Sequence, residues 1–431
     1  MDKPAPRKSS LTVWLANHPA AFTVIASVAA FGAYTCMYAF RKPFSAGVFK
    51  GMSVGGYDLK PLLVVAQMLG YAFSKLLGIK IVSEASAARR VAMIAAFIGT
   101  AGLALLVLPL VPPPVQLICL FVNGLPLGMV WGLVFSFLEG RRVTEFLGLG
   151  LSVSFIFASG WTKSVGAWLV HSANVPELWM PVTTGLLFVP LLALCLFFLS
   201  HLPAPDANDV KERTERKPMD GAARMAFIRS FGPVIGLLTI CYLLLTVYRD
   251  LRDTYMADVL KELGYKGDSS VFARIETFAG LGVLAALAGL WYIKDHWKAI
   301  LVYHWVIAFG TIMVGGSTLA FSAGLLSPFW WLCWTGLGVY LGYVPFNSIL
   351  FDRLLAATRS VGTASFLIYV ADSLGYLGSS ALYLTRTFAK VKAEWVPLTL
   401  HTGEILAVVS PALLLISWLS LSRRKKAQEV R

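Results

Sequence analysis

The sequence predicts an all-α membrane protein whose twelve transmembrane helices form two six-helix halves. Apolar segments of about 20 residues, the length that crosses the hydrocarbon core as a helix, recur along the whole chain. Of the 431 residues, 57% are hydrophobic and 14% are charged, whereas a soluble domain carries about 25% charged residues. The segments do not alternate apolar and polar residues as the strands of a membrane barrel do. They are therefore expected to be helices, which satisfy their own backbone hydrogen bonds in lipid.

The predicted spans fall into two groups of six. The first group comprises residues 20–49, 60–82, 91–111, 115–138, 147–170 and 178–200, and the second comprises 231–259, 270–292, 299–321, 328–351, 361–385 and 398–421. A stretch rich in proline and charged residues separates them. We therefore divide the chain into an N-terminal bundle (1–200), a cytoplasmic linker (201–228) and a C-terminal bundle (229–431), an organisation typical of transporters built from repeats.

The basic residues predict the orientation in the membrane. The chain has 37 Lys and Arg against 23 Asp and Glu, a net charge of +14. In a soluble protein this excess would favour nucleic acid as a partner. Here, with the N-terminus inside, 22 of the Lys and Arg fall on the cytoplasmic side and 7 on the outside. By the positive-inside rule, both termini are expected in the cytoplasm of a multi-pass protein of the inner (plasma) membrane, with no nucleic-acid partner. A monomer is expected.

The first span carries a polar face. Tyr34, Tyr38 and Arg41 are spaced i, i+4, i+7 and share one side of a helix. If the helix continues to Lys50, the first plausible surface residue, Arg41 lies roughly 13 Å inside that boundary. Lys42 follows directly. In the alternative, the helix ends just before Arg41, and both basic residues reach the outer interface by snorkelling.

The seventh span repeats this pattern. Tyr242 and Arg249 share one helix face, and Tyr248 and Arg252 share a neighbouring face, with an aspartate directly after each arginine. An outer amphipathic extension with surface ion pairs is the alternative, and it fits Arg252 better than Arg249.

The two arginines predict an anionic ligand. Arg41 and Arg249 occupy similar depths in the first helix of each half, positions that face each other across the centre of a transporter with two-fold pseudo-symmetry. Two guanidinium groups require an anionic partner. Their planar forks of donors match carboxylate or phosphate oxygens, and phosphate suits two opposed arginines best.

Four further charged residues inside predicted spans are candidates, because charge in the membrane is costly and marks function. Lys75 in the second span is expected to line the pathway. Lys163 in the fifth span lies nearer the outer half and can either pair with an acid or snorkel. Glu276 in the eighth span is a partner for an arginine or a proton carrier. Asp372 in the eleventh span has no evident partner; it is a proton carrier, a partner for a lysine, or a packing residue.

The sequence shows no enzyme motif. It has no nucleotide-binding loop, no metal-ligand cluster and no nucleophile triad, so no catalytic residue, metal or cofactor is predicted. The five cysteines all lie in apolar segments without metal-ligand spacing, and nothing indicates a disulfide framework.

Residue patterns in several spans are similar to those of one group of transporters. They are Tyr34, Tyr38, Arg41, Lys42 and Phe44; Gly70-Tyr71 with Ser74-Lys75; Asn123-Gly124 with Trp131; Leu260-Lys261-Glu262; Tyr343 with Pro345; Gly362-Thr363-Ala364; and Gly375-Tyr376-Leu377-Gly378. In order and spacing they resemble the major facilitator superfamily, and within it the organophosphate:phosphate antiporters, the glycerol-3-phosphate and hexose-phosphate transporters. The resemblance is that of a divergent member, because Phe157 and Thr246 stand near positions where that family has histidine and tyrosine.

The resemblance implies a major facilitator fold and a phosphate site. In that family the two tyrosines and the arginine of the first span surround the substrate phosphate, which implies this role for Tyr34, Tyr38 and Arg41. The lysine of the second span faces the pathway, which implies the same for Lys75. The position of Leu260-Lys261-Glu262 selects Arg249 over Arg252 as the second phosphate ligand.

The leading hypothesis is a secondary active transporter that moves a small anion, an organic phosphate or inorganic phosphate, by alternating access. Exchange of an organic phosphate for inorganic phosphate follows if the loaded carrier changes between its inward-open and outward-open states more readily than the empty carrier. A proton-coupled carrier of an organic anion or another solute is the alternative, motivated by Glu276 and Asp372. A non-transporting sensor of phosphate esters is a third hypothesis of another class.

Overall fold

The computed structural model describes residues 9–83, 85–138, 144–205, 221–265, 268–358, 364–388 and 394–429. Almost all of them are helical, and one short antiparallel hairpin joins β1 (Ser53–Val54) to β2 (Tyr57–Asp58). Within these ranges, seven helices are long and apolar enough to cross a membrane, and a bent helix pair makes up to eight. The chain is therefore a multi-pass helical membrane protein.

The first group of helices precedes the linker. Its α-helices are α1 (Ser10–Asn17), α2 (Pro19–Ala39), α3 (Leu59–Ser83), α4 (Ala87–Val107), α5 (Pro113–Phe135), α6 (Thr144–His171), α7 (Met180–Leu187) and α8 (Val189–Ser200), and its 3-10 turns are η1 (Pro43–Ala46) and η2 (Leu108–Leu110). Helices α7 and α8 form the bent pair, at 44° to one another. Helix α3 packs on α5, α4 on α5, and α2 on both α6 and α8.

The second group follows the linker. It consists of α10 (Gly221–Thr254), α11 (Met256–Glu262), α12 (Val271–Ala288), η3 (Gly289–Tyr292), α13 (His296–Ser322), α14 (Pro328–Ser348), α15 (Leu350–Ala357), α16 (Ala364–Phe388) and α17 (Trp395–Glu429). Helix α13 packs on α14 and α17, and α10 packs on α16 and α17. Asp295 caps α13, and the hydrogen bond that it accepts from the Lys298 N–H lowers the pKa of the Asp295 carboxyl.

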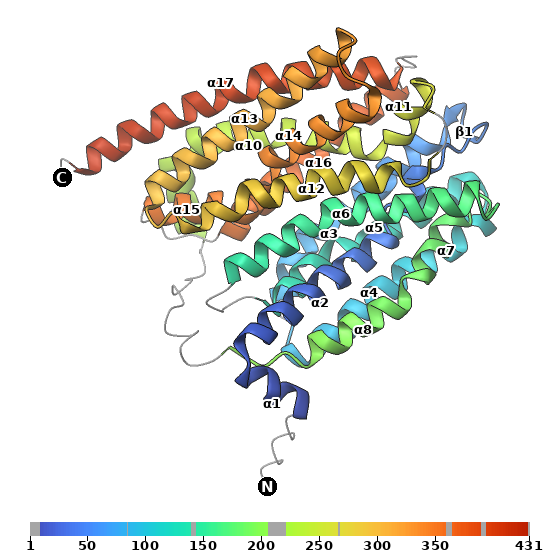
Figure 1. Cartoon of the computed structure of the whole chain (residues 1–431), viewed down its shortest axis with the longest axis horizontal. Helices are drawn as coiled ribbons and strands as arrows, with labels where there is room; N and C mark the ends of the chain where they lie inside the picture. Colours follow the sequence, from blue (N-terminus) through green and yellow to red (C-terminus); the bar gives the residue numbers. More distant parts are fainter. Residues whose placement is uncertain are drawn as a thin grey trace.

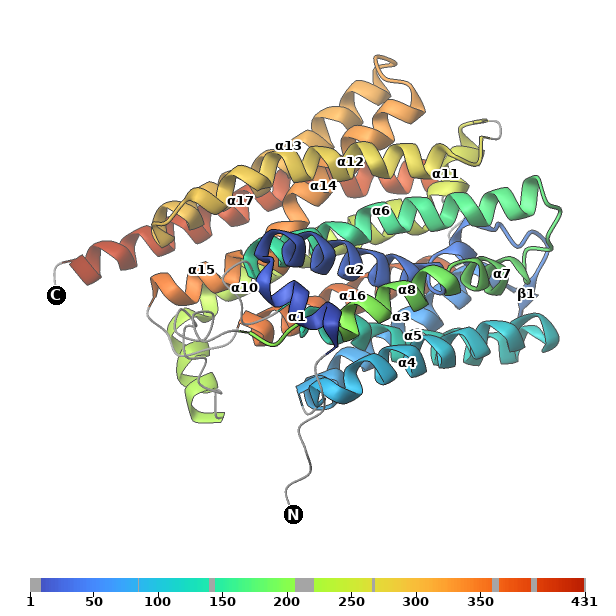
Figure 2. The ribbon, with the colours of Figure 1, turned by 60° about the horizontal axis from the view of Figure 1, so that its bottom comes forward.

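The two groups meet along three helix contacts. Helix α6 packs on α12 and on α14, and α3 packs on α16. In Figure 1 the blue-to-green and the yellow-to-red helices are closest at the end that carries β1 and α11, and they diverge toward the end where both termini lie. Figure 2, turned by 60°, shows α6 and α12 running side by side. The polar site described below lies between these groups.

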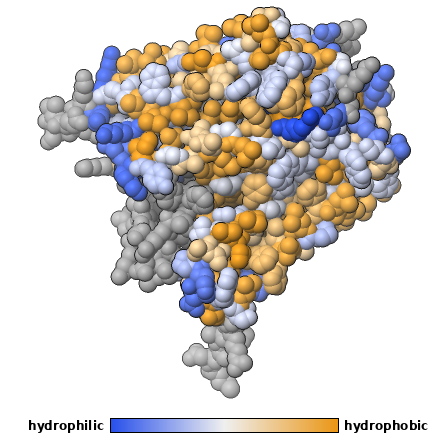
Figure 3. Space-filling model, viewed as in Figure 1, coloured by the Kyte–Doolittle hydropathy of each residue, from blue (hydrophilic) through white to orange (hydrophobic). Residues whose placement is uncertain are grey.

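The outer faces of several helices are apolar. Large hydrophobic side chains stand exposed on α2, α4, α13 and α17, among them Val28, Leu103, Leu319 and Val408. Figure 3 shows this apolar surface over much of the visible face. An exposed apolar surface of this extent is untenable in water and suits lipid.

Each predicted span overlaps a helix, but the first one ends earlier than expected. Helix α2 stops at Ala39 instead of continuing to residue 49. The N–H groups of Arg41 and Lys42 both donate to the Tyr38 carbonyl, which closes the last turn. Pro43 lacks an N–H and disfavours helical geometry in the residue before it. The helical-rise argument for the depth of Arg41 is therefore wrong, although its side chain is buried.

Other boundaries also differ. The predicted span 231–259 divides at Tyr255 into α10 and α11, and the span 328–351 divides at Ile349 into α14 and α15. Helix α10 already begins at Gly221, inside the predicted linker, of which residues 206–220 lie outside the described ranges. The β1–β2 hairpin was not predicted, because two-residue strands carry no periodic signal.

Small residues bring helices into close contact. A Cβ at Gly70 of α3 would collide with the Phe121 carbonyl of α5, and a Cβ at Gly124 would collide with the Gln67 carbonyl of α3. Backbones that approach this closely are typical of membrane helix pairs. This contact fixes α3, which carries several residues of the site.

Candidate functional site

The ten predicted site residues are all buried in the structure, none more than 9% exposed. They come from the end of α2 and the segment after it, and from α3, α6, α10, α12 and α16: Tyr34, Tyr38, Arg41, Lys42, Lys75, Lys163, Arg249, Arg252, Glu276 and Asp372. Helices α3, α6 and α16 are long but fall outside the helices that count as apolar spans. Their polar residues point inward, toward the contact between the two helix groups.

Arg41 lies just beyond the C-terminus of α2. Its guanidinium stacks over the ring of Tyr71 from α3, 3.7 Å from the ring centroid, and lies 5.7 Å from the centroid of Tyr38. Its backbone carbonyl accepts a hydrogen bond of 3.1 Å from Gln67, which holds this segment against α3. Among the described residues no carboxylate pairs with the guanidinium, and its Nε has no hydrogen-bond partner. A buried charge without a partner is costly unless an anion joins it.

Aromatic rings line the space around Arg41. Tyr34 and Tyr38 contact each other edge to face, with centroids 5.3 Å apart. Tyr71 of α3 meets Tyr376 of α16 in the same manner at 5.2 Å, so this ring pair joins the two helix groups. Phenol hydroxyls and ring faces next to a guanidinium can both donate hydrogen bonds to an anion and hold the cation in place.

Arg249 lies on the other side of this ring pair. Its guanidinium is 4.1 Å from the centroid of Tyr343 and 5.8 Å from that of Tyr376. It pairs with the adjacent Asp250 through Nη2 at 2.7 Å, and Ser379 donates to the other oxygen of that carboxylate at 2.9 Å. Unlike Arg41, Arg249 therefore already has an acidic partner.

Asp253 is shared by two lysines from the first helix group. Lys42 forms an ion pair with one of its oxygens. Lys163 of α6 forms an ion pair with the other at 2.6 Å and also donates to the Asp253 backbone carbonyl at 2.9 Å. Ser159 donates to the same carboxylate at 2.5 Å. Lys163 therefore pairs with an acid and does not snorkel, and its side chain is 1% exposed.

Asp372 has partners that the sequence did not reveal. Lys75 of α3 lies 3.2 Å from one oxygen, and the Tyr242 hydroxyl donates to the other. The Tyr242 hydroxyl is also 2.7 Å from that of Tyr343 and accepts a bond from Asn347 at 3.0 Å. Of the three alternatives for Asp372, the geometry fits a partner for a lysine, and a phenol from the second group is a further partner.

Arg252 and Glu276 form a separate ion pair. The Arg252 Nη1 and the Glu276 Oε1 are 2.7 Å apart, with both side chains fully buried. The guanidinium also donates to the Leu332 carbonyl at 2.7 Å, so the pair links α10, α12 and α14 within the second group. Arg252 thus faces away from the Arg41 surroundings.

The buried charges of the site sum to a positive net charge. Its six buried cations and four buried carboxylates leave an excess of two positive charges: Arg41, Lys42, Lys75, Lys163, Arg249 and Arg252 against Asp250, Asp253, Glu276 and Asp372. One charge belongs to the unpaired Arg41, and the other arises because two lysines share Asp253. The nearby Lys60–Asp258 pair, at 2.5 Å, adds no net charge.

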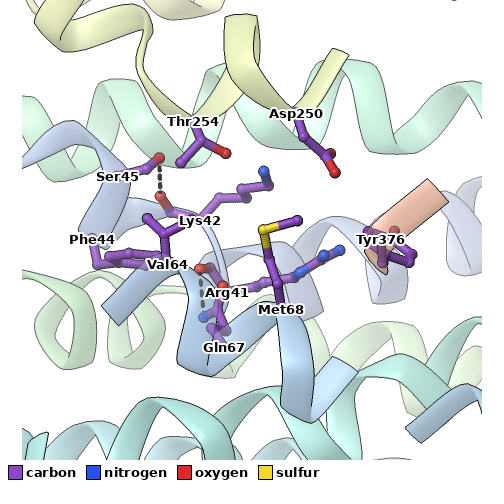
Figure 4. Close-up of a pocket in the computed structure, with 10 residues that line it drawn as sticks. All are labelled: Arg41, Lys42, Phe44, Ser45, Val64, Gln67, Met68, Asp250, Thr254 and Tyr376. Atoms are coloured by element: carbon purple, nitrogen blue, oxygen red, sulfur yellow. Dashed lines mark hydrogen bonds between the residues drawn. The ribbon is translucent and has the colours of Figure 1, made fainter. Parts of the chain in front are cut away.

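A small cavity lies against Arg41. Figure 4 shows its lining: the guanidinium of Arg41 points toward Tyr376, and the Lys42 ammonium points toward the α10 segment that carries Asp250 and Thr254. Only about 10 Å³ is open to the centre of a water molecule, room for roughly one water. In this conformation the cavity does not hold a larger molecule.

Sequence reasoning missed several members of this site. Tyr71 and Lys75 are four residues apart and so share a face of α3, which could have identified Tyr71 as a site residue. Asp250 and Asp253 were noticed only as neighbours of the arginines. Their cross-chain partners could not be found, because contacts such as Lys163–Asp253 join residues 90 positions apart.

The comparisons with known proteins agree with a transporter fold. A solved structure of a D-xylose-proton symporter matches with a TM-score of 0.60 and 14% identity, over 92% of this chain and 96% of that one. A solved structure of a mutant of the nucleoside transporter NupG also matches, with a TM-score of 0.60 and 12% identity, over 91% of this chain and 99% of that one. Identities this low show the fold alone, which is that of major facilitator transporters.

Sequence comparison places the chain in a family. No curated protein is significantly similar to it. A family model described as "Family of unknown function (DUF5690)" matches residues 43–424. This range holds nearly the whole chain, including the predicted site residues from Lys75 to Asp372, whereas Tyr34, Tyr38, Arg41 and Lys42 precede it. The protein therefore belongs to this family of unknown function, with the fold of a membrane transporter.

Proposed function

We propose that the protein is a secondary active transporter that moves a small anion across the inner membrane by alternating access. In this proposal twelve spans form two pseudo-symmetric six-helix bundles, residues 1–200 and 229–431, and both termini are cytoplasmic. The single observation that carries the proposal is Arg41, a buried guanidinium with no acidic partner among the described residues. Such a group is stable when an anion binds to it.

The charge excess supports a dianion as the solute. Two positive charges are uncompensated in the site, so a ligand with two negative charges would neutralise it. An organic phosphate or inorganic phosphate meets this condition, and its oxygens match the fork of a guanidinium. In the proposed bound state Arg41 binds the phosphate with Tyr34 and Tyr38, and Arg249, Lys75 and Lys42 complete the positive surroundings.

The contacts between the helix groups support alternating access. Ion pairs from Lys42 and Lys163 to Asp253, and from Lys60 to Asp258, join the groups at the end that carries α11. With a cavity that admits about one water, a solute reaches Arg41 only after these groups move apart. An empty site leaves Arg41 unpaired during that movement, which favours exchange of one anion for another.

Counterflow in proteoliposomes tests the proposal. Liposomes loaded with unlabelled phosphate, a sugar phosphate or a dicarboxylate are expected to take up the labelled form of the same anion. Arg41→Lys keeps the charge but loses the fork and the stacking on Tyr71, so uptake should fall by about tenfold or more. Arg274→Lys is the matched control, because the Arg274 side chain is 51% exposed and pairs only at the surface.

Two outcomes would contradict the assignment. Uptake by Arg41→Lys at the wild-type rate would show that the guanidinium does not bind the solute. Binding of the anion by the wild type without any flux would instead favour the sensor hypothesis. Equal insertion of both variants in the membrane is the necessary control.

A further inference from the structure

The two helix groups carry opposite buried charges. Before the linker, the buried charged side chains that the structure describes are all cations: Arg41, Lys42, Lys60, Lys75 and Lys163. Every buried carboxylate in the described part of the chain comes after the linker: Asp250, Asp253, Glu276 and Asp372. The second group also holds buried arginines, and two of them, Arg249 and Arg252, pair with acids of that same group. Separation of the groups therefore takes the lysines of the first group away from the aspartates of the second.

The ion pairs that join the two groups within the described ranges all have the same direction. In each of them the first group supplies a lysine and the second an aspartate, as in Lys42–Asp253, Lys163–Asp253, Lys60–Asp258 and Lys75–Asp372. An anionic solute can replace the aspartates as the partner of the lysines. It cannot replace the lysines as partners of the aspartates, which need a positive charge of their own.

The two buried aspartates of these pairs differ in their surroundings. Asp253 lies one residue before the end of α10, next to the outer segment that carries α11, so water can solvate it once the groups part. Asp372 lies in the interior of α16, about 12 Å from the start of that helix. Its exposed fraction of 4% is close to the 5% of Asp253, so its depth within the helix is what distinguishes it from Asp253. A carboxylate in such a place becomes neutral when its counter-ion leaves.

Few groups contact Asp372. Lys75 pairs with it from α3, and Tyr242 donates to it from α10. Behind Tyr242 lie Tyr343 and Asn347 of α14, and Arg249 stacks on the Tyr343 ring. Helix α15 and strand β2 also pack on α16, but none of their described residues contacts the Asp372 carboxylate. Lys75 is therefore the cation on which its charge depends.

We propose that Asp372 is a proton-binding group that couples anion transport to proton movement. The bound anion takes Lys75 as a partner, and separation of α3 from α16 removes Lys75 from Asp372. The carboxylate then accepts one proton from the water on the open side and becomes a carboxylic acid that donates to a neighbouring phenol or amide oxygen. After reorientation Lys75 returns, and the proton leaves to the water on the other side. One proton thus accompanies each anion in net transport.

This inference rests on the proposed anion transport, and two assays distinguish failure of the coupling from failure of the transport. Counterflow with inorganic phosphate on both sides tests transport alone, because equal movement of phosphate in both directions carries no net protons. Accumulation of labelled phosphate driven by an acidic outside medium tests coupling. The titration of phosphate itself is the same for every variant, so differences between variants report on the protein.

Asp372→Asn should retain counterflow above that of protein-free liposomes but accumulate no more phosphate with the pH gradient than without it. Asp372→Glu, which keeps a titratable carboxyl, should still accumulate phosphate. Asp258→Asn is the matched control from another cross-group pair, the Lys60–Asp258 pair, and it should also respond to the gradient.

Each alternative result has a distinct meaning. If the wild type shows counterflow but its phosphate accumulation does not respond to the pH gradient, the coupling is overturned and anion transport stands. The same conclusion follows if Asp372→Asn still accumulates phosphate with the gradient. Loss of counterflow in both Asp372 variants, with normal membrane insertion, overturns the coupling role because it places Asp372 in anion binding. Absence of phosphate counterflow in the wild type overturns both proposals for phosphate.

Discussion

At the residue scale, the central feature is a guanidinium that has aromatic neighbours and no acid. Arg41 stacks on Tyr71 at 3.7 Å, while Arg249 and Arg252 each pair with a carboxylate. The three arginines therefore have different roles even though all are buried. In the proposed function Arg41 binds the anion, whereas Arg249 is already paired with Asp250, and Arg252 links helices of the second group through Glu276 and the Leu332 carbonyl.

The stacking on Tyr71 has a measurable consequence. Tyr71→Leu removes the ring that stacks on Arg41, so the guanidinium loses a contact worth about 0.5–2 kcal/mol. It is also no longer held in its orientation. The apparent affinity for the transported anion should weaken by about 2- to 30-fold. Tyr71→Phe retains the ring and is the matched control. Equal KM values for counterflow in all three proteins would show that the stacking does not support the site.

At the scale of helices, the Arg252–Glu276 pair connects α10, α12 and α14. Glu276→Gln leaves a fully buried guanidinium without its counter-charge, and the thermal stability of the purified protein should fall by an amount equivalent to about 3–5 kcal/mol. Replacement of both residues, Arg252→Met with Glu276→Leu, should recover most of the loss, because no buried charge remains.

An exposed pair provides the control for that experiment. Arg274 and Asp268 lie 2.6 Å apart with side chains about half exposed. The N–H of Ser270 holds the pKa of Asp268 below its ordinary value, and Asp268→Asn keeps an acceptor for that bond. It should change stability by about 0–1 kcal/mol. A loss as large as that of Glu276→Gln would contradict the distinction between the two pairs.

Helix positions were largely predictable from the sequence, whereas helix ends were not. Apolar length alone located a helix in every predicted span, because the bilayer imposes that length. At Pro43 the backbone overrides apolarity: α2 stops before it, and Pro43–Ala46 form the 3-10 turn η1. Pro126 and Pro233, by contrast, lie inside continuous helices. Tyr255 and Ile349, where two other spans divide, carry no such signal.

Many members of the candidate site were predictable from the sequence, but their pairing was not. Burial of the charged residues follows from their positions in apolar segments. Which acid pairs with which base depends on how α3, α6 and α10 come together, and Lys75–Asp372 joins residues far apart in the chain. The sequence therefore indicated Lys163 and Asp372 as candidates without identifying their partners.

At the scale of the whole molecule, the distribution of Lys and Arg predicts the orientation. Lys50 and Asp295 are exposed and lie on opposite sides of the proposed topology. The five native cysteines are buried, so background labelling should be low. A membrane-impermeant maleimide should label Lys50→Cys in intact cells and Asp295→Cys only in inverted vesicles. The reverse pattern would contradict the cytoplasmic placement of the termini.

The measurement that tests the account most directly is anion binding to the purified protein by titration calorimetry. The wild type should bind one phosphate or phosphate ester per chain, with competition by other dianions and none by a neutral sugar or nucleoside. Arg41→Lys should weaken this binding by about tenfold or more, because a charge-assisted bidentate contact is lost. Binding of a neutral solute with equal affinity by the wild type and Arg41→Lys, and no binding of phosphate by either, would contradict the central claim that Arg41 forms an anion site.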